Sequence, residues 1–81
     1  MARILYFAGL ADAVGHVSED LTLPETVSDV RALIEWLRSR GPQFEQALAQ
    51  DRLRVTVNRQ LSNPDGRVSD SDEIALIGLP R

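Results

Sequence analysis

The chain has 81 residues, 43% of them hydrophobic and 26% charged, with a formal net charge of −3, a composition typical of one folded domain spanning residues 1–81. The lack of cysteine excludes disulfides and thiolate chemistry, and the lack of a basic run argues against a nucleic-acid partner. No apolar run is long enough for a membrane span and no signal-peptide pattern is present, so we expect no membrane association and a cytoplasmic location.

Two strands are expected before the longest helix. Residues 2–7 form a short apolar run with β-branched and aromatic side chains, which predicts a buried strand. Residues 10–15 are compatible with a loop or with a helical turn that ends at Gly15. Residues 16–23 alternate between apolar and polar side chains, which predicts a half-buried second strand. Glu19 interrupts the alternation, so we expect the pattern to hold best in the second half of this segment.

The longest predicted helix covers residues 26–40, where apolar side chains recur at helical spacing. Thr26 is expected to cap its start, with Asp29 favourable near the positive end of the helix dipole. Arg40 suits the last turn. The Gly-Pro pair at 41–42 is expected to end the helix, because glycine tolerates a left-handed turn and proline cannot continue the helical hydrogen bonds. The stripe that we expect to be buried consists of Val27, Val30, Leu33, Ile34 and Leu37.

The second half of the chain predicts one further helix and three strands. Residues 43–50 are typical of a short helix or turn, and residues 53–58 alternate as a third strand. A tight turn with a short strand is expected at 58–61, and a proline- and glycine-containing turn at 63–66. Residues 74–79 predict the last strand. One helix across one face of a mixed sheet predicts an α+β fold of the β-grasp (ubiquitin-like) type, with about five strands.

Four segments of the chain resemble one known family. They are ILYFAGLADAVG, PETVSDVRALIEWL, VTVNRQL and DSDEIALI, in this order over almost the whole sequence. They are similar to the small subunit of molybdopterin synthase, a ubiquitin-like sulfur carrier. The resemblance implies a non-catalytic carrier subunit of a sulfurtransferase complex, which works with an adenylating enzyme and with the large synthase subunit. It also implies no bound cofactor. The C-terminal carboxylate would become an adenylate and then a thiocarboxylate that supplies sulfur during molybdenum cofactor biosynthesis.

The reactive tail of this family ends in Gly-Gly, which the present sequence lacks. We expect the natural gene product to continue beyond Arg81 with Gly-Gly, because the sequence ends about two residues short of the usual end of the family. Glycines suit such a tail because residues without side chains can enter a narrow channel. A longer tail that is processed, or a chain that has lost carrier function, are the alternatives. The residues assigned to the C-terminal tail are Gly78, Leu79, Pro80 and Arg81, and the last three of them are expected to form its stem.

Leu61 and Ile77 are, by the same resemblance, expected to contact the large subunit. Alternatively, both are ordinary core residues. Two other functions compete with the synthase role. One is a ubiquitin-like binding module without covalent chemistry. The other is the sulfur carrier of thiamine biosynthesis, which the length of the middle segment disfavours.

The remaining candidate residues favour structural roles. His16 has no accompanying nucleophile and is expected at a solvated turn. The acidic residues within 65–73 lack the spacing of a calcium loop, so we expect no metal site. Trp36 is expected to pack against Phe44, with an exposed partner anchor as the alternative. The arginines expected to be solvated are Arg52, Arg54 and Arg59.

Overall fold

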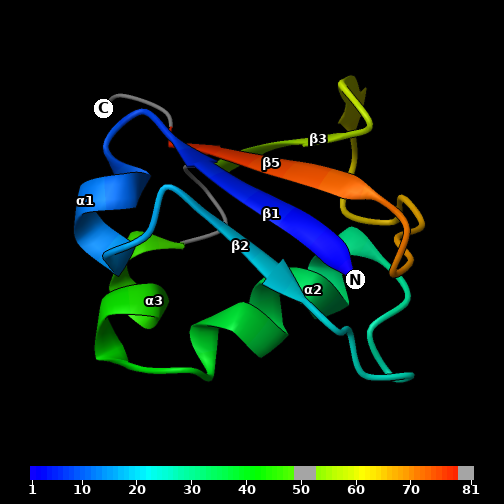
Figure 1. Ribbon diagram of the computed structural model, residues 1–81, viewed down its shortest axis with the longest axis horizontal. Helices are drawn as coiled ribbons and strands as arrows, with labels where there is room; N and C mark the ends of the chain where they lie inside the picture. The colour runs from blue at the N-terminus through cyan, green and yellow to red at the C-terminus, as the bar shows by residue number, and fades with distance from the viewer. Residues whose placement is uncertain (49–52, 79–81) are drawn as a thin grey trace.

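A five-stranded mixed sheet with helices on one face makes up the described residues, 1–48 and 53–78, of the computed structural model (Figure 1). The strands are β1 (Ala2–Phe7), β2 (Ser18–Leu21), β3 (Leu53–Val57), β4 (Gln60–Ser62) and β5 (Glu73–Gly78). The helices are α1 (Leu10–Val14), α2 (Val30–Arg38) and α3 (Pro42–Ala47). No helix in this part of the chain has the length and apolarity needed to cross a bilayer.

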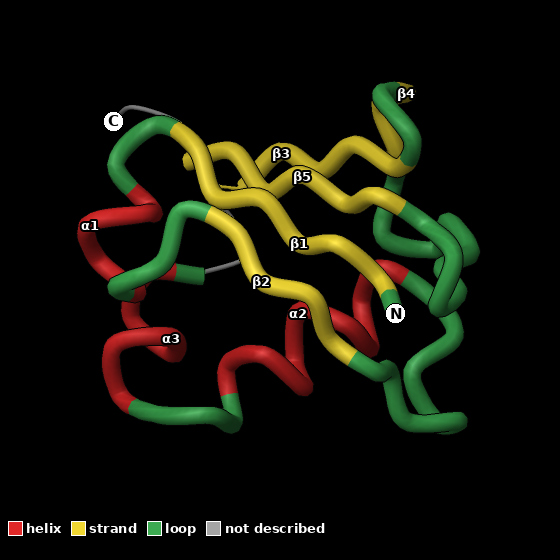
Figure 2. The backbone as a smooth tube through the Cα atoms, viewed as in Figure 1, coloured by secondary structure: helices red, strands yellow, loops and turns green. Residues whose placement is uncertain are grey.

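The first and last strands lie side by side in the middle of the sheet. The strand order is β2-β1-β5-β3-β4, so β4 forms one edge (Figure 2). β1 pairs antiparallel with β2 and parallel with β5, while β3 pairs antiparallel with both β5 and β4. The helix α2 lies across one face, as an α+β fold requires. This arrangement confirms the predicted β-grasp fold.

The helix α2 begins at Val30, later than predicted, because the preceding residues make other contacts. Asp29, not Thr26, is the N-cap, and its Oδ1 accepts a hydrogen bond from the Ala32 N–H at 2.8 Å. The residues before it form a turn and a β-bridge between Asp29 and Arg67. These tertiary contacts outweigh the helical periodicity of residues 26–29.

The helix also ends earlier than predicted. Arg38 is its last residue, and the Ser39 hydroxyl donates to the Trp36 carbonyl at 2.6 Å. Gly41 has an extended backbone, with φ of 164°, so the predicted left-handed glycine stop is wrong. Pro42 instead opens α3, where its missing N–H costs no helical hydrogen bond.

The remaining boundaries agree only in part with the prediction. Residues 10–14 form a helix that Gly15 closes in the left-handed conformation at φ of 86°, which matches the helical alternative for this segment. The second strand is shorter than the predicted segment 16–23, and the ends of the predicted segments 43–50 and 74–79 lie outside the described residues. The alternation in β2 includes Glu19, contrary to our expectation, because Glu19 points toward the interior and Asp20 toward solvent.

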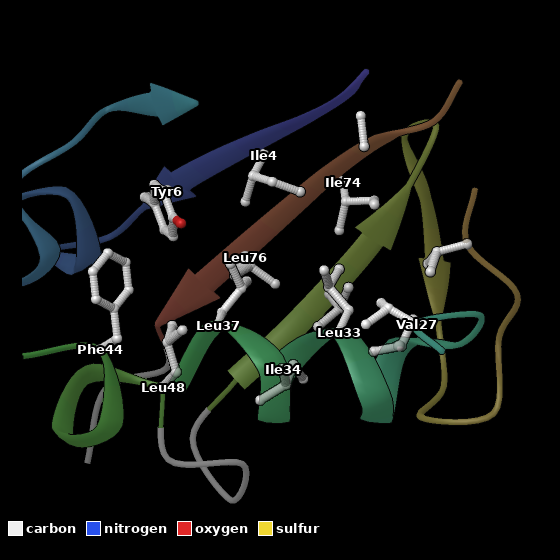
Figure 3. Packing of buried hydrophobic residues seen from close by; sticks show 14 of the residues in the cluster. Ile4, Tyr6, Val27, Leu33, Ile34, Leu37, Phe44, Leu48, Ile74 and Leu76 are labelled. Atoms are coloured by element: carbon white, nitrogen blue, oxygen red, sulfur yellow. The ribbon is translucent and has the colours of Figure 1, made fainter. Parts of the chain in front are cut away.

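The core lies between α2 and the sheet (Figure 3). All five residues of the predicted helical stripe are buried. Leu33 and Leu37 are fully buried, and they face the sheet residues Ile74 and Leu76. Trp36 is partly buried and packs against this cluster, which includes Phe44, so its packing role is favoured over that of an exposed anchor.

The acidic segment before β5 ties loops together. The Asp70 carboxylate accepts a hydrogen bond from the Leu23 N–H at 2.7 Å. Asp72 accepts from the Ser69 N–H and from the Asn58 side chain. These carboxylates therefore hold the segment before β5 against the loop that joins β2 to α2 and against the turn of the β3–β4 hairpin.

Candidate functional site

The face of the sheet opposite α2, here called the outer face, carries apolar side chains. In β1, Ala2, Ile4 and Tyr6 are buried under the helices, so the alternate residues Leu5 and Phe7 project to the outer face. No helix covers this face in the part of the chain that the structure describes (Figure 1). Apolar residues on an uncovered sheet face are candidates for partner contact.

The register of the strands brings these side chains into two neighbouring rows. In the first row, Phe7 on β1 lies opposite Ile77 on β5, which lies opposite Arg54 on β3. The second row runs across β1, β5, β3 and β4, with one residue from each strand lying opposite the next. This row consists of Leu5, Ala75, Thr56 and Leu61. We call the apolar members of both rows the outer patch; they are Leu5, Phe7, Leu61, Ala75 and Ile77.

Exposure separates the two residues that the sequence selected. Leu61 is 67% exposed, so the structure excludes the core alternative for it. Ile77 is partly exposed and lies on the outer face, outside the buried cluster. The two residues therefore belong to one surface, and their contact with a partner stays a prediction.

Phe7 is the exposed residue among the three members of this surface that sequence reasoning missed. It is 48% exposed and pairs with Ile77. The run at 2–7 is apolar at both alternating sets of positions, which indicated a strand buried on both faces. A strand whose second face is covered by a partner protein also carries apolar side chains at both alternating sets of positions. The apolar residue at position 7 was therefore the signal that could have selected Phe7.

The end of β5 is held by close packing around Gly78. This residue pairs with Leu53 on β3 and is the last residue of β5, and its assignment to the C-terminal tail stays a prediction. A Cβ at this position would lie 3.2 Å from the Ala8 carbonyl oxygen and 3.3 Å from Leu10 Cγ. A side chain at this position would therefore require the Ala8 carbonyl or the Leu10 side chain to shift by a few tenths of an ångström. The other predicted residues of the tail, from 79 to 81, lie outside the described residues.

A polar network on the helix-covered face joins β1, β2 and the end of α2. The Tyr6 hydroxyl donates to Glu19 Oε2 at 2.7 Å, and Arg40 donates to both oxygens of Glu19, at 2.8 and 2.9 Å. The Glu19 side chain is only 10% exposed. Arg40 also lies over the Phe44 ring, 4.8 Å from its centroid. Arg40 was expected inside the helix, and it instead anchors the chain after α2 to β2.

The charges in this network support one another. The hydrogen bonds from Arg40 hold the pKa of Glu19 below its usual value. Burial and the Glu19 carboxylate raise the pKa of Tyr6 far above its usual range, so the phenol stays a donor. The hydrogen bonds to Glu19 raise the pKa of Arg40. The network is fully paired, which is typical of a structural role.

The remaining candidates do not assemble a reactive site. His16 is exposed, as expected, and its ring stacks beside Phe44 at 6.5 Å between centroids. Arg54 and Arg59 are exposed, and Arg52 lies outside the described residues. Within 1–48 and 53–78, no group of three metal-ligating side chains occurs. Among the described residues, the outer patch is therefore the candidate functional surface, and its contact with a partner stays a prediction.

The topology and the exposed apolar face define a ubiquitin-like protein of the β-grasp class. The sequence profile of the ThiS family matches residues 4–78. The chain belongs to the ThiS family, a family of ubiquitin-like sulfur carriers.

Two solved structures are similar over nearly the whole chain. One is a Pyrococcus furiosus protein provisionally named molybdopterin converting factor, subunit 1. It has 22% identity and a TM-score of 0.76, and the match covers 98% of this chain and 97% of that one. The other is small archaeal modifier protein 1 of Haloferax volcanii, with 19% identity, a TM-score of 0.77 and the same two coverages. No curated protein matches this sequence. At these identities the structural likeness establishes the fold.

Proposed function

We propose that this chain is the small, sulfur-carrying subunit of molybdopterin synthase. The family match over residues 4–78 supports the sulfur-carrier part of this proposal, because it extends from the first strand to the end of β5. The likeness to the Pyrococcus furiosus protein supports the molybdenum cofactor pathway among the pathways that use such carriers.

The proposed chemistry takes place at the C-terminal carboxylate. An adenylating enzyme joins this carboxylate to the AMP unit of ATP and releases pyrophosphate. A sulfur nucleophile then displaces AMP, leaving a thiocarboxylate. The large synthase subunit receives the tail, and the sulfur passes to the pterin precursor while the carrier returns to its carboxylate form. No side chain of the carrier takes part in these steps.

The folded body has two tasks in this proposal. Strand β5, fixed at Gly78 between β3 and the loop after β1, gives the tail a defined point of departure. The outer patch, with Phe7 and Leu61 as its exposed members, binds the large subunit beside that point. Apolar contacts at the centre of an interface supply most of its affinity, so Ile77 in the middle of the sheet is the expected anchor.

Reconstitution with purified partners tests this proposal. The product of the full gene is combined with an adenylating enzyme, ATP, a sulfide source and a molybdopterin synthase large subunit. We expect the precursor to be converted to molybdopterin. In a parallel reaction with the thiazole-forming enzyme of thiamine biosynthesis, we expect no thiazole. Thiazole without molybdopterin would contradict the synthase assignment and favour the thiamine carrier.

A second candidate is a protein modifier, which the likeness to the Haloferax volcanii modifier favours. Here the adenylated carboxylate would form an amide with a lysine of another protein, with release of AMP. A binding module would instead leave the carboxylate unchanged. Branched peptides in a digest of the cell proteins would support the modifier, and their absence together with molybdopterin formation supports the carrier.

A further inference from the structure

The pairing of β4 with β3 leaves part of the sheet edge open. β4 reaches only from Gln60 to Ser62, and its pairing ends at Val55 opposite Ser62. β3 begins earlier, at Leu53. Because hydrogen-bonding positions alternate along a strand, Leu53 presents its N–H and C=O to the β4 side, as Val55 and Val57 do. Among residues 1–48 and 53–78, no strand pairs with Leu53 on this side, so its backbone is a candidate partner for a further extended segment.

A cavity of about 210 Å³ lies beside this open edge, between α2 and the β3–β4 pair. Its apolar wall is formed by Val30 and Ile34 of α2 and by Leu53, Val55 and Leu61 of the sheet. Pockets for drug-sized ligands are larger, roughly 300–1,000 Å³. The cavity is therefore suited to one or two side chains of a peptide.

Two arginines also line the cavity in a protein that is acidic overall. Arg54 makes no ion pair with any residue in 1–48 or 53–78. Arg31 binds Asp65 at 2.8 Å, but both side chains are more than half exposed, so this ion pair contributes little stability and an incoming carboxylate can replace it. The cavity thus combines an apolar wall with positive charge.

We propose that this cavity is a docking groove for an extended acidic peptide segment of a partner protein. An apolar side chain of the segment fills the cavity, its backbone pairs with Leu53, and flanking carboxylates bind Arg31 and Arg54. Backbone pairing at a sheet edge supplies affinity, while the cavity and the two charges supply specificity. The groove shares Leu61 with the outer patch, but its other apolar residues lie on the helix-covered side, and the inference goes beyond the sulfur-carrier proposal without depending on the tail chemistry.

An NMR titration of the folded, isotope-labelled protein tests the groove. The probe is the blocked peptide Asp-Val-Leu-Val-Glu, compared with Lys-Val-Leu-Val-Lys and Asp-Ser-Ser-Ser-Glu. We expect saturable shifts at the amides of Leu53, Val55 and Ser62 with the first peptide, and slower hydrogen exchange of the Leu53 N–H. The basic peptide should bind roughly tenfold more weakly, since both of its terminal charges are reversed. The peptide without apolar residues should cause no saturable shift.

Matched charge reversals complete the test. Arg54→Glu should weaken binding of the acidic peptide by about fivefold, whereas Arg59→Glu, which makes the same charge change on the 90%-exposed side chain in the hairpin turn, should leave it within about twofold. Equal binding of the acidic and basic peptides would overturn the proposal, as would shifts centred on Phe7 and Ile77 or no saturable shift at all. Identical shifts with butyrate would reveal a small carboxylate site and would also overturn it.

Discussion

Phe7 and Ile77 lie opposite each other in the parallel pair of β1 and β5, on the face of the sheet that α2 does not cover. One belongs to the first strand and the other to the last, so folding brings the two ends of the sequence into one surface. Their pairing joins the outer patch to the end of β5. Under the sulfur-carrier proposal, the body and the C-terminal tail would therefore be recognised at one interface.

Ile77→Lys should weaken binding to the large synthase subunit roughly tenfold or more, because it places a charge at the centre of the apolar interface. Val17→Lys is the matched control, since Val17 is 73% exposed and lies outside the outer patch. Calorimetric titration gives both affinities, and circular dichroism shows whether each variant is folded. Unchanged affinity in a folded Ile77→Lys protein would remove Ile77 from the interface.

Leu33→Ala should lower the free energy of unfolding by about 2–5 kcal/mol, because Leu33 is fully buried between α2 and the sheet. Leu61→Ala should change it by less than about 0.5 kcal/mol, because Leu61 is mostly exposed. Urea unfolding followed by tryptophan fluorescence measures both values. Equal losses in the two variants would be inconsistent with the assigned helix face.

The pKa of Glu19 predicts a specific acid sensitivity. Arg40 holds this pKa below its unfolded value, so the stabilisation is fully present above the unfolded pKa and is lost as the pH falls through the folded pKa. Glu19→Gln should therefore flatten the fall in stability on the acid side. The control is Glu35→Gln, since Glu35 is exposed on α2 and makes no ion pair among the described residues. The free energy of unfolding is measured for both proteins as the pH falls from above the unfolded pKa of Glu19 to below its folded pKa. An equal fall for Glu19→Gln and wild type would contradict the stabilising role of the Glu19 carboxylate.

Gly78→Ala should destabilise the fold by about 1–3 kcal/mol, because the added Cβ approaches the Ala8 carbonyl oxygen and the Leu10 side chain. Gly41→Ala is a suitable comparison. Its backbone is extended and its Cβ would meet only the flexible Gln43 side chain, so we expect a change within about 0.5 kcal/mol. Thermal unfolding compares the two variants, and equal stability would show that the loop after β1 yields to the extra methyl group.

The sequence predicted the fold well where periodicity reflects burial. The stripe on α2 was identified completely, because each of its residues is buried by the same sheet face. The start of α2 was wrong because residues 26–29 make loop contacts with residues far along the chain, which local periodicity does not contain. Glu19 seemed to interrupt β2 because its partners, Tyr6 and Arg40, come from other elements.

The candidate site was only partly predictable. Leu61 and Ile77 came from the resemblance, and the register places them on one face. Phe7 was missed because an apolar strand looks the same whether its second face is covered by the protein itself or by a partner. The groove beside Leu53 could not be predicted, since it depends on where the pairing of β4 ends.

The mass of the C-terminal peptide after activation tests the central claim most directly. The product of the full gene is incubated with its adenylating enzyme, ATP and sulfide. It is then digested, and the mass of its C-terminal peptide is measured by mass spectrometry. The carrier account predicts that one sulfur replaces one oxygen at the C-terminal carboxylate, and only when ATP is present. An unchanged carboxylate, under conditions in which the same enzyme activates another sulfur carrier, would contradict it.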